Sequence, residues 1–149
     1  MIPEEEIRSN MIDMGYILPS VRHVFPSYYK LGDGTVLKVV VHLNYLLPNP
    51  LDPNGFSINA TNIFSTFVPK EMRKPEAFTP RVDLNTGIIN EDVEFDVLQE
   101  NFTVYDLSNN MVLSIKPVVG QIKKTKFYTR EGEPIYSVSI NPVMKIKKK

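Results

Sequence analysis

The sequence predicts a mainly β fold: an antiparallel sandwich or barrel of roughly eight or nine strands, preceded by one short α-helix. Residues 36–47 form the longest run of strand-forming residues, and large apolar side chains recur there at every second position. Further strand-like segments follow at hairpin spacing, separated by turn residues. Only the first residues of the chain show a helical period, so we expect a single helix.

The predicted helix covers residues 3–14. A proline occupies its first position, three glutamates follow at the positive end of the helix dipole, and a glycine comes directly after its end. Ile7, Met11 and Met14 recur at the i, i+4, i+7 spacing of one helix face. We expect this stripe to pack on the sheet or against one end of a barrel; a partner groove is the alternative.

Residues 16–30 contain two prolines, so we expect an extended, irregular segment with one short strand near Tyr28. An Asp-Gly turn then leads into a strand over residues 35–47, whose odd-numbered side chains face the core. At thirteen residues this strand is longer than the usual five or six, and it should bend and contribute to two sheets or run round a barrel.

The remaining predicted strands are separated by proline-rich or glycine-containing loops. In the strand after the first proline-rich loop, a change of apolar face predicts a bulge near Asn62. The carboxyl terminus is read as a basic tail, residues 145–149, and the whole chain, 1–149, as one domain. These strands cover residues 56–68, 81–84, 88–98, 102–107, 111–116, 121–129 and 135–140.

Composition excludes several classes of protein. The chain has 149 residues, 42% hydrophobic and 23% charged, which is too apolar for general disorder and too polar for a membrane span. With no cysteine, disulfides, thiolate nucleophiles and cysteine-ligated metals are excluded. The amino terminus is acidic where a secretory signal would be basic, so we expect a cytoplasmic protein. The formal net charge is +0, and no membrane partner is expected.

Charge is balanced overall but separated along the chain. Residues 76–106 contain eight acidic residues and one basic residue, whereas residues 116–149 contain nine basic and two acidic. The first hypothesis is therefore a non-enzymatic binding or assembly module. It would act through a sheet edge and complementary charged patches, on another copy of itself or on another protein.

A second hypothesis is a single-stranded nucleic-acid-binding barrel, because the basic strand near the carboxyl terminus combines cations with aromatic side chains. In the competing interpretation, its lysines protect an exposed edge strand from aggregation. The candidate residues are Lys123, Lys124, Lys126, Phe127, Tyr128 and Arg130, with the lysine tail as additional phosphate contacts.

A third hypothesis is a small-ligand carrier or enzyme using Lys38, His42 and Asn44, which share one face of the long strand. On an exposed face the same residues would simply be solvated. The chain has only two histidines, no nucleophile elbow and no phosphate-cradling glycine loop. We therefore expect no catalytic residues, no cofactor and no metal.

Two acidic patterns fall short of a metal or catalytic site. Asp83 and Glu94 fall at the first and last places of a calcium-loop window, but Ile88 stands where the loop needs glycine, which favours a plain hairpin turn. Glu94 and Asp96 share one strand face, an arrangement more typical of a soluble surface than of paired catalytic acids.

Overall fold

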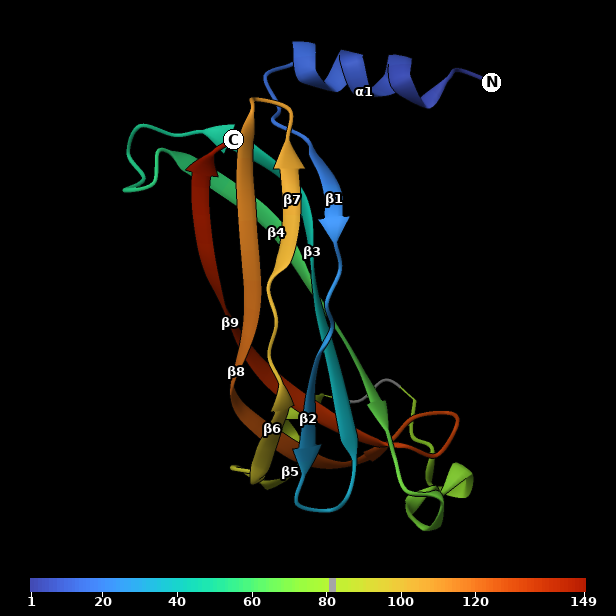
Figure 1. Ribbon diagram of the computed structural model, residues 1–149. Coiled ribbons are helices and arrows are strands. Elements are labelled where there is room, and N and C mark those ends of the chain that lie inside the picture. Colours follow the sequence, from blue (N-terminus) through green and yellow to red (C-terminus); the bar gives the residue numbers. More distant parts are fainter. Residues whose placement is uncertain (81–82) are drawn as a thin grey trace.

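The computed structural model describes residues 1–80 and 83–149 and confirms the mainly β fold with one helix near the amino terminus. The strands form two antiparallel sheets that face each other as an open sandwich, not a closed barrel (Figure 1). Helix α1 (Glu4–Asp13) lies beyond the strand ends, at the end of the sandwich that also holds the carboxyl terminus.

The first sheet has the order β4-β3-β2-β6. The second sheet is built around the long strand β8, which pairs with β7 and β5 along one side and with β9 along the other, while β1 pairs with β7. The bounds in the first sheet are β2 (Ser27–Leu31), β3 (Val36–Pro48), β4 (Phe56–Phe67) and β6 (Phe95–Gln99). Those in the second are β1 (Pro19–His23), β5 (Ile88–Asn90), β7 (Thr103–Leu107), β8 (Met111–Tyr128) and β9 (Pro134–Lys148).

The core lies between the sheets, and β3 contributes to both of its apolar clusters. Leu37, Val39, Val41 and Leu43 are at most 1% exposed, as the alternation predicts. A bulge between Leu43 and Tyr45 then shifts the period by one residue, so that Leu46 becomes the buried side chain. The predicted bulge near Asn62 is wrong, because the extra residue lies on β3 and not on β4.

The prediction of a buried helical stripe is also wrong. No residue of α1 is buried, because the helix projects past the strand ends instead of lying on a sheet face (Figure 1). The side chain of Arg8 connects α1 to the start of β1, because its guanidinium donates to the carbonyl oxygens of Pro19 at 3.1 Å and Leu18 at 3.3 Å. Among the residues described, no helix combines the length and apolar character needed to cross a membrane.

Three predicted boundaries differ in the second half of the chain. Segments 111–116 and 121–129 are parts of the single strand β8, because a bulge at Val119/Gln121 accommodates Gly120 and Pro117 lies opposite Pro142 of β9. The segment 135–140 extends to Lys148, so the predicted basic tail 145–149 is largely strand. Its Ile146 pairs with Leu113 and packs against the core, which accounts for the extension.

The predicted strand 88–98 is divided between the two sheets. β5 pairs with β8 in one sheet and β6 pairs with β2 in the other, so the chain crosses the sandwich between them. The crossing is held by hydrogen bonds from Val93 N–H to the Ile122 carbonyl and from Gly32 N–H to the Glu94 carbonyl, both 2.8 Å. Of the predicted strand 81–84, residues 81–82 lie outside the described residues.

Short helical turns occupy the proline-containing loop after β4 and the segment before β5. They are η1 (Lys70–Met72), η2 (Pro75–Ala77) and η3 (Leu84–Thr86). Leu84 therefore begins a helical turn, whereas the prediction placed it at the end of a strand. The side chain of Asp83 caps η3 by accepting from Asn85 N–H at 3.1 Å, which favours the turn. The irregular segment 16–30 holds two short strands, β1 and β2, and the predicted one near Tyr28 is confirmed as β2.

Candidate functional site

The outer edge of β4 is a long exposed stretch of strand. β4 pairs with β3 on one side, and no strand within the described residues pairs with its other side. None of its 12 residues is buried. We call this unpaired side of β4 the open edge.

Hydrogen bonds made by β3 show which residues of β4 direct their backbone toward the open edge. Leu46 exchanges two backbone hydrogen bonds with Ile17, each 2.9 Å, so its polar groups point away from β4. In an antiparallel ladder, the residue opposite such a position also points away. That residue is Ile58.

The same reasoning holds on the far side of the bulge. Tyr105 Oη donates to the Val41 carbonyl at 3.1 Å and accepts from Leu43 N–H at 3.2 Å. The backbone polar groups of both β3 residues therefore point away from β4. Their partners on β4 are Asn62 and Ala60. Because the pattern has a period of two, six β4 residues present N–H and C=O groups at the open edge. We call these the edge-facing residues: Phe56, Ile58, Ala60, Asn62, Phe64 and Thr66.

The sequence of β4 lacks the features by which natural sheets protect their edges, although the Glu133 carboxylate accepts a hydrogen bond from Thr66 Oγ1 at 3.4 Å near the end of the strand. The strand has no charged residue and no proline, and the nearest charges along the chain are Asp52 before it and Lys70 after it. Exposed sheet edges are usually short, charged or interrupted by proline. An unprotected edge of this length is therefore a template for another strand.

The other free edges are protected. β1, β5 and β6 have 5, 3 and 5 residues. β9 has 15 residues, but it begins with a proline and contains Pro142. It also carries three lysines near its carboxyl end, where it still pairs with β8. β4 is thus the exception among the edge strands of the described residues.

Apolar side chains on both faces of β4 remain in contact with solvent. Phe64 lies opposite the buried Val39 and so faces the space between the sheets, yet it is 41% exposed. Ile63 and Phe67 face outward beside Val40 and Val36 and are 52% and 57% exposed. An added strand would cover part of this apolar area.

Five of the candidate nucleic-acid residues lie on β8, an interior strand with neighbours on both sides, and Arg130 lies in the turn after it. Lys123 is 3.4 Å from the Glu91 carboxylate. Phe127 packs so closely on Gly87 that a β-carbon at Gly87 would overlap its ring. Lys126 and Arg130 are exposed, with Arg130 over the Phe78 ring at 4.9 Å and Lys74 over the Tyr128 ring at 5.9 Å.

Lys124 belongs to a hydrogen-bonded cluster around Asp33. The Asp33 carboxylate accepts from Lys124 Nζ at 3.0 Å, from Thr35 N–H at 2.9 Å and from the Tyr136 hydroxyl. Burial by itself would raise the pKa of Asp33, but the three donors outweigh burial and lower that pKa to about 2. Lys124 is thereby paired with an acid of its own chain.

His42 and Asn44 line an open pocket of about 550 Å³ between α1 and β3, whereas Lys38 does not. His42 is exposed, and the Asn44 amide is committed to Asn59 Oδ1 and Thr61 Oγ1, both 2.9 Å away. The three candidates therefore do not converge on one point.

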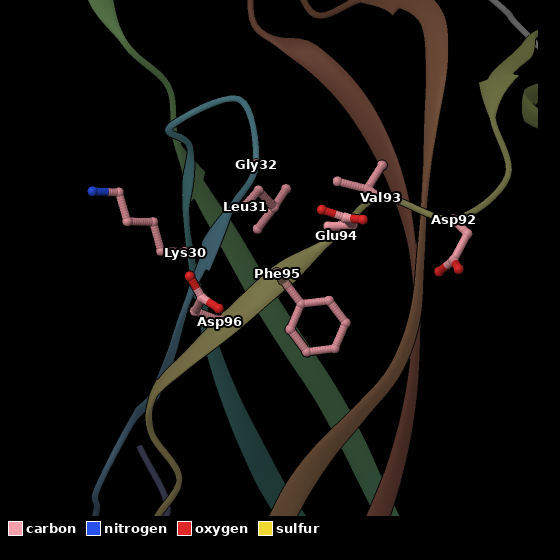
Figure 2. Close-up of a pocket in the computed structure, with 8 residues that line it drawn as sticks. All are labelled: Lys30, Leu31, Gly32, Asp92, Val93, Glu94, Phe95 and Asp96. Atoms are coloured by element: carbon pink, nitrogen blue, oxygen red, sulfur yellow. The ribbon is translucent and has the colours of Figure 1, made fainter.

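A second pocket, of about 600 Å³, lies where β2 meets the segment leading into β6. Figure 2 shows that its carboxylates do not converge: those of Asp92, Glu94 and Asp96 lie at separate places around the pocket, and the Lys30 amine points away from them. Within residues 1–80 and 83–149, no group of three or more acidic or histidine side chains is arranged to hold a metal ion.

The signal for the open edge was present in the sequence but could not be interpreted there. The β4 segment stands out because it is uncharged and free of proline. Whether a strand is central or at an edge depends on the strand order, which no local sequence pattern reveals. No protein-family model matches the chain, and comparison with curated proteins and with solved structures found no significant similarity.

Proposed function

We propose that the protein is a binding or assembly module that accepts an extended protein strand along the open edge of β4. The observation that carries this proposal is the 12-residue strand without charge or proline, whose alternate backbone groups face outward and pair with no strand of the described residues. Strand addition uses such groups for affinity and alternate side chains for specificity. Exposed Ile63, Phe64 and Phe67 supply the apolar part of the contact.

The charged segments contribute less to this proposal than the sequence suggested. Several of their charges are paired within one copy of the chain, as in Lys123 with Glu91, Lys124 with Asp33, and Lys149 with Asp106 at 3.4 Å. Such pairs leave less free charge for a partner. The proposed contact is therefore mainly backbone and apolar, with weak dependence on salt.

The test compares two changes at one edge-facing residue. Asn62→Pro removes an N–H that points to the open edge and places a ring where the partner backbone would lie, without breaking a hydrogen bond to β3. Asn62→Ala removes the same side chain but keeps the N–H. The probe is a labelled peptide with the sequence of residues 56–67 and blocked ends, and its binding to the full chain is followed by fluorescence anisotropy.

The peptide should bind the natural chain and the alanine variant alike, and the proline variant at least roughly tenfold more weakly. Circular dichroism and urea unfolding would establish that the proline variant keeps its fold. Equal binding by all three chains would refute a role for the open edge.

A further inference from the structure

Resting on the function proposed above, we infer that the strand received by the open edge is β4 of a second copy, paired antiparallel about a two-fold axis at Thr61. The two four-stranded sheets would then form one continuous sheet. An isologous contact of this kind closes on itself and consumes both open edges, so no further copies add.

Charge favours a second copy as the occupant. Residues 53–69 contain no charge, so two β4 strands meet without repulsion between like charges. In an antiparallel pair, Asp52 of one copy and Lys70 of the other come to the same end of the contact. The formal net charge of +0 adds no long-range repulsion between copies.

The hydrogen-bonding pattern restricts the register. Edge-facing residues must lie opposite edge-facing residues, so an axis passes through a residue and not between two. An axis at Thr61 pairs Ile58 with Phe64 on the inner face and Ser57 with Ser65 on the outer face. In this register Ile58 of one copy lies opposite Phe64 of the other, so that an apolar side chain covers Phe64, which is 41% exposed in the single copy.

The test uses the absence of cysteine from the natural chain. Thr61→Cys places two thiols at the axis in a non-hydrogen-bonded pair, where α-carbons lie about 4.5 Å apart and a disulfide fits. Ser137→Cys is the control, because Ser137 is also exposed and lies on β9, the other long edge strand. Both chains are oxidised mildly and the disulfide-linked dimer is measured, together with the oligomeric state of the natural chain by sedimentation.

We expect a concentration-dependent dimer of the natural chain, and a linked dimer that forms at least tenfold faster for Thr61→Cys than for Ser137→Cys. Adding Asn62→Pro to the Thr61→Cys chain should abolish that advantage. A monomeric natural chain with equal, slow linking of both cysteine variants would overturn the inference. If the labelled peptide still binds in a manner sensitive to Asn62→Pro, only self-pairing fails; if it does not bind either, the proposed function fails too.

Discussion

Replacement of Asp33 by asparagine tests the packing at the end of the sandwich opposite α1. Asparagine keeps the acceptor for Thr35 N–H but removes the negative charge that pairs with Lys124 and the Tyr136 hydroxyl. The Asp33 side chain is 20% exposed, so solvent screens this cluster only partly.

The magnitude follows from the pKa of Asp33, about 2 in the folded chain against the ordinary value of 3.8. This difference corresponds to ~2 kcal/mol of folding free energy at neutral pH. Because the folded-state pKa is the lower one, the stabilisation is fully present above pH 4 or so and is lost as the pH falls through about 2.

Urea unfolding at about pH 6 and at about pH 2 measures the effect. Asp33→Asn should lower the free energy of unfolding by ~2 kcal/mol at the higher pH, and the two chains should converge at the lower pH. A difference that is the same at both values of pH would refute the assignment of this stability to the ionised carboxylate.

Three further substitutions test the described packing. Leu46→Ala, at a fully buried position after the β3 bulge, should cost about 2–5 kcal/mol in urea unfolding, and a cost below about 1 kcal/mol would contradict the shifted period. Gly132→Ala should destabilise strongly, because Gly132 has a φ of 86° and a new β-carbon would lie 2.7 Å from Lys74 N; an unchanged thermal midpoint would contradict this contact. Met14→Glu should change the free energy of unfolding by less than about 0.5 kcal/mol, since Met14 is 71% exposed; a large loss would place α1 against the sheets.

Much of the fold could be predicted because alternation of apolar residues marks strands and turn residues mark their ends. β3 and β4 were predicted to within two residues for this reason. That two predicted strands join into the single strand β8 could not be predicted, because Pro117 and Gly120 ordinarily indicate the end of a strand. Only the pairing with β9 shows that the strand continues past them.

The sequence predicted the kind of candidate site, a sheet edge, but not the strand that forms it. The sequence indicated association through a sheet edge, but it suggested the basic segment 121–129, which lies in the interior of a sheet. Lysines mark an edge only if the strand is at one, and strand order results from contacts between residues far apart in the chain. Likewise the i, i+4, i+7 stripe of α1 describes a helix face without stating that anything covers it.

Hydrogen exchange at single amides of β4, measured as a function of protein concentration, tests the role of the open edge most directly. The amides bonded to β3, such as that of Ile63, should be protected at every concentration, because their partner is in the same copy. The edge-facing amides of Ile58, Ala60, Asn62 and Phe64 should exchange rapidly in dilute solution and become protected as copies associate. Equal protection of both sets in dilute solution, or no gain for the edge-facing set at high concentration, would contradict the account.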